Sequence, residues 1–220
     1  VTLNSTFLSN SAKVSGGGCY LENLKIIMNI NCVLRLNSAP IRGGSMLIEK
    51  VKIVSIVNSE HDKNSAKTGG VYYMDQMMVY INTSSFVDNK AEAGASIYAT
   101  SGQGAVFVET YFYLNFASSG GSAAYLVLVS FLRIIGCKFV RNEAKSGGVI
   151  HALDFTFIES LNNHFVNNKN LRTNEISQGK SYTEVSNIYV NNFAKDSGGC
   201  VFLVNVDDVK IASSSMKANR

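Results

Sequence analysis

An asparagine recurs nine times along this 220-residue chain, at intervals of 24 to 27 residues. The positions are Asn10, Asn37, Asn64, Asn89, Asn115, Asn142, Asn168, Asn192 and Asn219. A fixed period of 20–50 residues indicates a solenoid, a propeller or an array of small units. Because the period runs from one end of the chain to the other, it constrains the fold of the whole sequence.

The residues around each asparagine repeat as well. Eight of the nine residues that stand three positions before it are apolar or aromatic: Phe7, Leu34, Phe86, Phe112, Phe139, Phe165, Tyr189 and Met216, with His61 as the exception. Two positions after it, seven of the first eight repeats have alanine: Ala12, Ala39, Ala66, Ala91, Ala117, Ala144 and Ala194. A pair of small residues follows, such as Gly43-Gly44 or Gly147-Gly148, and then a β-branched and aromatic run.

A unit of about 26 residues fits one coil of a parallel β-helix, with three short strands joined by three turns. Its apolar runs are rich in Val, Ile, Tyr and Phe, which favour strands. Leucine-rich repeats need several fixed leucines, and propeller blades need roughly 40 residues. We therefore predict an all-β fold: a single right-handed parallel β-helix, or solenoid, of about eight coils of roughly 26 residues over residues 1–220.

In such a coil, equivalent residues stack about 4.8 Å apart. The asparagines should then form a side-chain amide ladder from coil to coil, as in cross-β structures. The aromatic column should form an apolar stack, and the Ala and Gly columns a crowded corner where Gly also supplies positive φ. We expect these residues to build the fold rather than to bind a ligand.

The repeat resembles that of the polymorphic outer-membrane protein family, which carries F-x-x-N and G-G-[AVI]-[IVL] motifs. Here these motifs read Phe7-Leu8-Ser9-Asn10, Phe86-Val87-Asp88-Asn89, Phe139-Val140-Arg141-Asn142 and Gly147-Gly148-Val149-Ile150. The resemblance covers nearly the whole chain and implies a right-handed parallel β-helix used as a surface-exposed passenger or adhesin. The seventh repeat departs from it, because Thr173-Asn174 stands where the glycine pair should be.

The charge and the apolar runs of the sequence limit the kinds of partner that are expected. The net charge is +4, and Lys and Arg look scattered, without the stripe that tracks phosphates, so nucleic acid is not expected as a partner. The longest apolar run, residues 123–132, is too short to span a bilayer, so no transmembrane segment is expected in this chain. No signal peptide or polar capping coil is present, and we expect a segment of a longer protein, extracellular or at the cell surface.

The four cysteines occupy two positions of the repeat. Cys19 and Cys200 follow the glycine pair, and Cys32 and Cys137 precede the asparagine by five residues. Equivalent cysteines are several coils apart, so free thiols are expected, although a bond between Cys19 and Cys32 within one coil stays open. Two N-x-[ST] sequons, at Asn4 and Asn82, are candidate glycosylation sites of a secreted protein.

Parallel β-helices include polysaccharide lyases and hydrolases, which align carboxylates from adjacent coils. One such column is predicted, with Glu22, Glu49 and Asp75 at eleven or twelve residues after their asparagines. It is most simply a solvated corner; a Ca²⁺ site and a glycosidase-type acid pair are the alternatives. His61, His151 and His164 lack metal-ligand spacing. We therefore expect no catalytic residue, no cofactor and no enzyme activity.

Several strands are apolar at every position, although a strand with one exposed face should alternate. The column that holds Tyr20, Met46, Tyr72 and Ile97 faces outward if its small neighbours, such as Ser45, face inward. The opposite orientation stays open. We predict a lateral interface with protein partners or with another copy, centred on Tyr72, Met78, Phe107, Tyr111 and Tyr125.

The sequence thus predicts a structural or adhesive β-helical scaffold of a large cell-surface or filament-forming protein that binds protein partners laterally. The alternative is a carbohydrate-binding or polysaccharide-cleaving β-helix. The acid column distinguishes the two, because activity would require its carboxylates to converge in an open groove.

Overall fold

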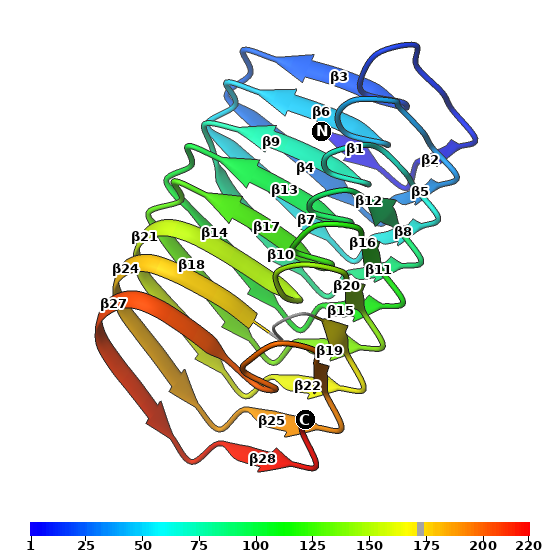
Figure 1. Ribbon diagram of the computed structural model, residues 1–220. Coiled ribbons are helices and arrows are strands. Elements are labelled where there is room, and N and C mark those ends of the chain that lie inside the picture. Colours follow the sequence, from blue (N-terminus) through cyan, green and yellow to red (C-terminus); the bar gives the residue numbers. More distant parts are fainter. Residues whose placement is uncertain (171–173) are drawn as a thin grey trace.

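The computed structural model describes residues 1–170 and 174–220, and within this range the chain is a stack of coils without a helix (Figure 1). All strand pairs are parallel, and they join residues 24 to 27 positions apart in the sequence. The predicted all-β solenoid of about eight coils of roughly 26 residues is therefore confirmed. Its right hand stays a prediction from the crossover rule.

Two faces of the coil belong to one 14-stranded sheet. The first face contains β3 (Cys19–Glu22), β6 (Met46–Glu49), β9 (Tyr72–Asp75), β13 (Ile97–Thr100) and β17 (Ala124–Val127). The second face contains β1 (Thr2–Leu3), β4 (Ile26–Ile30), β7 (Ile53–Val57), β10 (Met78–Asn82), β14 (Gly104–Val108) and β18 (Phe131–Ile135). Both faces continue in the long strands β21 (Ile150–Leu161), β24 (Asn174–Val185) and β27 (Phe202–Ala212), which join them.

The third face is a nine-stranded sheet of β2 (Thr6–Leu8), β5 (Val33–Arg35), β8 (Glu60–Asp62), β11 (Ser85–Val87), β15 (Tyr111–Tyr113), β19 (Lys138–Val140), β22 (His164–Val166), β25 (Ile188–Val190) and β28 (Ser215–Lys217). A narrow fourth face follows it, with β12 (Lys90–Ala91), β16 (Phe116–Ala117), β20 (Glu143–Ala144), β23 (Lys169–Asn170) and β26 (Phe193–Ala194). Figure 1 shows these two-residue strands stacked in one column along the solenoid.

The coil turns at residues with a left-handed backbone, most of which are not glycine. The residue before each ladder asparagine has φ between 51° and 56°: Ser9, Leu36, Lys63, Asp88, Leu114, Arg141, Asn167, Asn191 and Ala218. An L-residue loses about 1–2 kcal/mol in this region. The contacts made by the following asparagine must therefore hold the turn in place.

The asparagine side chains provide these contacts. Between Asn37 and Asn192 the column is fully buried. Asn115 shows the pattern: its Oδ1 accepts hydrogen bonds from the backbone N–H and the Nδ2 of Asn89, at 3.1 and 3.0 Å. Its Nδ2 donates to the carbonyl oxygen of Phe86 at 2.9 Å and to Oδ1 of Asn142 at 3.0 Å. Each amide thus ties its own coil to the coils on both sides.

A second buried polar column lies at the turn between the second and third faces. The backbone N–H of Cys32 donates to Oγ of Ser59, and that of Ser59 to Oγ of Ser84, both at 3.1 Å. Further along, the N–H of Cys137 donates to Oδ1 of Asn163 at 2.8 Å. No single residue type marks this column in the sequence, because Cys, Ser and Asn all occur in it. Small polar side chains share the role that asparagine performs alone in the first ladder.

The aromatic column packs inside the coil. Its rings stack with centroids 4.2 to 5.0 Å apart: His61, Phe86, Phe112, Phe139, Phe165 and Tyr189. His61 keeps its two ring nitrogens bonded, Nδ1 to the carbonyl oxygen of Ser85 and Nε2 to the hydroxyl of Tyr72, both at 2.9 Å. Burial lowers the pKa of His61 to about 4, so the ring is neutral and replaces a phenylalanine in the stack.

Three of the five residues predicted for the lateral interface are buried, and the prediction is wrong for the two of them that point into the core. Tyr72 and Phe107 point into the core with 0% exposure, and Met78 is 7% exposed. Tyr111 and Tyr125 are half-buried. The prediction that the column of Tyr20, Met46, Tyr72 and Ile97 faces outward is also wrong. Cys19, not Tyr20, pairs with Met46, and Met46, Tyr72 and Ile97 all face the core.

The seventh repeat keeps the coil despite its divergent sequence. Asn174 pairs with Ile150, and its Oδ1 accepts a bond from the Ile150 N–H at 3.4 Å. Asn170 occupies the alanine column, and its Oδ1 accepts a bond from the N–H of Ala144 at 2.9 Å. Thr173, where the glycine pair is missing, lies outside the described residues.

Candidate functional site

The outer surface of the second face is rich in apolar side chains. Alternation turns three residues of each strand outward in β4, β7, β10, β14 and β18. Eleven of these fifteen are apolar: Ile26, Met28, Ile30, Ile53, Val57, Met78, Tyr80, Val106, Val108, Phe131 and Ile135. The others are Ser55, Asn82, Gly104 and Arg133. We call this surface the lateral face.

Part of the lateral face is open to water. Ile26, Ile53 and Tyr80 are 53%, 38% and 44% exposed. A concavity of about 340 Å³ lies among Ser55, Val57, Tyr80, Asn82, Val106 and Val108. At its C-terminal side the surface is closed by Phe131, whose ring lies over Gly104 where a Cβ would collide with it. Apolar residues thus surround a shallow depression in the middle of the face.

The predicted acid column exists in the structure, at the outer edge of the first face. Glu22, Glu49 and Asp75 are register partners in β3, β6 and β9. Each of the two glutamates has a basic partner: Lys50 Nζ lies 2.8 Å from Glu22 Oε1, and Arg42 NH1 lies 3.5 Å from Glu49 Oε1.

The hydroxyl of Tyr20 donates to the same carboxylates, 2.8 Å from Glu22 and 3.1 Å from Glu49. The hydrogen bond from Lys50 and that from Tyr20 lower the pKa of Glu22, whereas burial and the charge of Glu49 raise the pKa of Asp75. Oxygens of both glutamates thus already bond to protein groups. The described residues contain no group of three His, Cys, Asp or Glu placed to hold a metal ion.

An aromatic stack stands beside the acid column on the outside of the first face. Tyr73, Tyr98 and Tyr125 stack with centroids 5.2 Å apart, and His151 continues the stack at 4.3 Å. Arg42 covers the free ring face of Tyr73 at 4.7 Å. Since both ring faces of each tyrosine are covered by a neighbouring ring or by Arg42, the tyrosines offer a sugar or a base no ring face to stack on. Tyr125, predicted as an interface residue, belongs to this closed stack.

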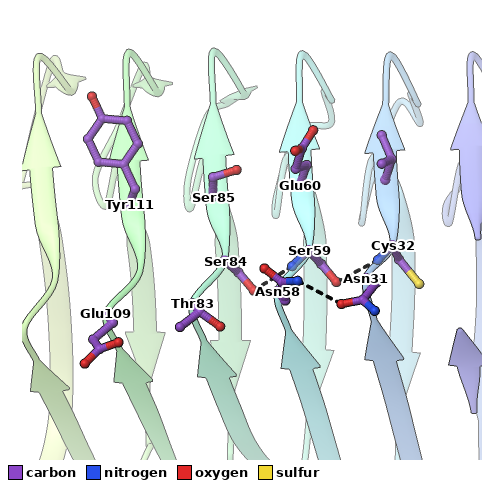
Figure 2. A pocket seen from close by; sticks show the side chains of 11 residues that line it. Asn31, Cys32, Asn58, Ser59, Glu60, Thr83, Ser84, Ser85, Glu109 and Tyr111 are labelled. Carbon is purple, nitrogen blue, oxygen red and sulfur yellow. Dashed lines mark hydrogen bonds between the residues drawn. The ribbon is translucent and has the colours of Figure 1, made fainter. Parts of the chain in front are cut away.

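A polar groove follows the turn between the second and third faces, and Figure 2 shows its side chains. Its volume is about 500 Å³, and its floor is the column of Cys32, Ser59 and Ser84. On one rim, Asn58 Nδ2 donates to Oδ1 of Asn31 at 2.9 Å, which forms an exposed asparagine ladder.

The other rim of the groove carries the outward side chains of the third face. These are Glu60, Ser85 and Tyr111, which are register partners in β8, β11 and β15 (Figure 2). A neighbouring concavity of about 690 Å³ shares Glu109 and Tyr111 and extends to Lys138. Amide, hydroxyl, carboxylate and one aromatic group thus line an open path along the solenoid axis. Tyr111 is the only predicted interface residue that lines it.

The four cysteines form no disulfide bond. Cys19, Cys32, Cys137 and Cys200 are all free thiols, as predicted. Burial raises the pKa of Cys137 to about 12 and that of Cys200 to about 11. Within residues 1–170 and 174–220, the structure contains no helix of the length and apolarity needed to cross a membrane.

The first repeat carries the sequence motif in full. Phe7 packs into the coil, Asn10 bonds to Asn37, and Gly16 makes a left-handed turn, so each part of the motif has a place in the fold. Residues 4–22 match the Chlamydia polymorphic membrane protein repeat. The resemblance seen in the sequence is therefore confirmed for the first coil. No curated protein and no solved structure shows a significant match to the chain.

Proposed function

We propose that the chain is a rigid β-helical segment of a surface-exposed protein, and that it acts as an adhesive scaffold whose lateral face binds a second protein chain. The lateral face carries this proposal. Monomeric proteins rarely expose contiguous apolar patches larger than a few hundred Å², and larger patches with a polar rim mark interaction sites. Ile53 and Tyr80 are well exposed in the centre of that surface.

Two further observations support a scaffold role. The asparagine ladder runs from Asn10 to Asn219 without a break, so adjacent coils are bonded through the core as well as through their strands. The match of residues 4–22 to a membrane-protein repeat supports a location at the cell surface. In the acid column, Glu22 and Glu49 are bonded to Lys50, Arg42 and Tyr20, which favours a structural rather than a catalytic role for these two carboxylates.

The test is the accessibility of the lateral face in the native assembly. Hydroxyl-radical footprinting of intact cells and of the isolated chain should show that Ile53 and Tyr80 are labelled in the isolated chain and protected in the assembly. Leu36 and Leu128 are 48% and 55% exposed at turns outside the lateral face, and their labelling should be the same in both states. Equal labelling of Tyr80 in both states would contradict lateral binding.

Matched variants separate binding from folding. Ile53→Lys with Tyr80→Lys should abolish the protection, because it places two charges on an apolar contact surface. Leu36→Lys with Leu128→Lys is the control, since the equivalent turn positions already hold Lys63 and Lys50. Protection that survives the first pair of substitutions would assign the contact to another surface.

Glycosylation at the two sequons is a separate proposal. Asn4 and Asn82 are both exposed, although Oδ1 of Asn4 accepts a hydrogen bond from Asn31 at 3.0 Å. A glycan on Asn82 would stand on the lateral face beside Tyr80. Glycosylation of Asn82 and binding of a protein to that face therefore exclude each other. Intact-mass analysis of protein isolated from its source distinguishes them.

Carbohydrate binding is the second candidate function, and the polar groove supports it. Glu60, Asn58 and Tyr111 offer hydrogen-bonding groups and one ring along an open path. A glycan array with the isolated chain tests this role. Binding that is lost in Tyr111→Ala would support it, and an array without a hit would count against it.

A further inference from the structure

Lysines that are far apart in the sequence gather on the narrow fourth face. The residue two positions after the ladder asparagine, alanine in seven of the first eight repeats, points inward, so the residues one and three positions after the asparagine point outward. Six of these are lysines: Lys13, Lys67, Lys90, Lys145, Lys169 and Lys195. All six are exposed. The scattered appearance of the basic residues in the sequence is thus misleading, and we call these six residues the lysine strip.

The strip concentrates the charge of the protein. The same two columns hold two acidic residues, Glu92 and Glu143. Arg220 also stands in these columns, directly after Asn219, so six lysines and one arginine against two glutamates leave a formal charge of +5 there, and the rest of the chain carries −1. The adjacent turn column adds Lys63 and Arg141 against Asp88.

The acidic residues on the face neutralise the strip only weakly. Lys67 lies 3.9 Å from Glu92, and Lys169 lies 3.8 Å from Glu143. Both pairs are more than a third exposed on each side, and such pairs contribute about 0–1 kcal/mol. Lys13, Lys145 and Lys195 have no carboxylate within 4.0 Å among the described residues. The strip therefore presents an attractive potential to an anion.

The fourth face also has depressions and rings between its lysines. A concavity of about 300 Å³ is lined by Lys145, Lys169, Lys195 and Phe193, and another of about 470 Å³ by Lys67, Lys90 and Phe116 among others. Phe193 is 44% exposed, and Lys145 Nζ lies 5.7 Å from the ring centroid of Phe116. Lysine and an exposed ring face together suit a ligand that carries both anionic groups and apolar C–H surface.

We propose that the lysine strip binds a linear anionic polysaccharide, with its sulfate or carboxylate groups on the lysines and its sugar rings against Phe116 and Phe193. The coils repeat about every 4.8 Å, so Lys145, Lys169 and Lys195 are placed to meet charges on neighbouring parts of an extended polymer. Across eight coils the strip is about 34 Å long, enough for an oligosaccharide of several units.

The geometry favours this class of polymer over nucleic acid. The strip is two outward columns wide, whereas a duplex presents two rows of phosphates on a broad surface. Binding of single strands depends on aromatic residues under successive bases. Phe116 and Phe193 are three coils apart. The choice of a polysaccharide also rests on the surface location proposed above, and the polar groove is unsuited to it because Glu60 and Glu109 would repel an anion.

The experiment uses the chain of residues 1–220 and size-defined heparin oligosaccharides as the probe. Surface plasmon resonance should show binding that weakens as salt is raised. The variant Lys145→Ser/Lys169→Ser/Lys195→Ser should lose about 10- to 100-fold in affinity, from roughly one lysine–anion contact per substituted residue. The control Lys25→Ser/Lys52→Ser/Lys180→Ser removes the same charge from exposed sites elsewhere and should bind within about twofold of the unmodified chain.

Equal losses in both triple variants would overturn the proposal, because net charge rather than the strip would then determine binding. A single-stranded oligonucleotide of the same charge that displaces heparin at lower concentration would overturn the choice of polysaccharide. Lateral-face variants should bind heparin normally, so failure of the proposed protein contact and failure of the strip are distinguishable. Unchanged circular dichroism of both triple variants shows that the coil is intact.

Discussion

The buried asparagine ladder makes a quantitative prediction for Asn115→Leu. The substitution keeps the volume of the side chain but removes the acceptor of two buried donors, the backbone N–H and the Nδ2 of Asn89. It also removes the donor to the carbonyl oxygen of Phe86. An orphaned buried donor costs about 1–3 kcal/mol, so the loss is about 2–6 kcal/mol. Domains unfold with about 5–15 kcal/mol, so the loss is a large fraction of the stability.

Denaturation with guanidinium chloride, followed by far-ultraviolet circular dichroism, measures this loss. Asn58→Gly is the control. Asn58 donates to Asn31 at 2.9 Å across the same coil spacing, but both side chains are exposed. Glycine also adopts the positive φ of residue 58 without strain. The control should therefore lose less than about 1 kcal/mol.

Hydrogen exchange localises the effect. In Asn115→Leu the backbone amide of Asn89 should lose its protection, while amides two or more coils away change little, because solenoid coils contact only their neighbours. Asn115→Asp should also destabilise the fold near neutral pH, since a carboxylate would face the carbonyl oxygen of Phe86 and Oδ1 of Asn142. A loss below about 1 kcal/mol in Asn115→Leu would refute the idea that the ladder stabilises the fold.

Three further predictions concern residues inside the coil. The pKa of His61 is about 4 in the folded chain and about 6.5 in the unfolded chain. The free energy of unfolding should therefore fall by about 3 kcal/mol as the pH drops from the higher to the lower value. In pH-dependent denaturation, His61→Phe should remove this part of the pH dependence. Cys137 should resist alkylation in the native state because burial holds its pKa at about 12, while denatured, unreduced protein should show four thiols; fewer would indicate a disulfide. Gly179→Ala should cost about 1–3 kcal/mol of stability, since the ring of Phe155 lies where the new methyl group would stand. In a double-mutant cycle, the second substitution Phe155→Ala should remove that loss. Additive losses in the cycle would contradict the contact.

The repeat period by itself determined the architecture. Residues about 26 positions apart stack whenever each coil has a constant length, so columns in the sequence become columns in space. On that basis the asparagine column, the aromatic column and the alignment of Glu22, Glu49 and Asp75 could all be placed before the structure was known. The free thiols followed from the same spacing.

Only the tertiary structure decided which columns face outward. Side chains alternate along a strand, but each left-handed turn resets the alternation, and the position of the turn shifts between coils. In the fifth coil the left-handed glycine is Gly121 rather than Gly120, so Ala124 takes the place predicted for Ala123. A shift of one residue exchanges core and surface. The prediction for Tyr72 is wrong because it makes the residues that precede its column, such as Ser45 and Val71, the inward ones, whereas both columns are buried. Phe107 lies between Val106 and Val108, and three successive apolar residues show no alternation from which to assign a side.

The lysine strip shows the converse case. Its members are up to 182 positions apart, between Lys13 and Lys195, and no local pattern links them. A signal did exist, because every member stands one or three positions after a ladder asparagine, on either side of the inward alanine. The sequence contains the register, but the charge pattern emerges only after the coils are stacked, since electrostatic potential depends on distances through space and not along the chain.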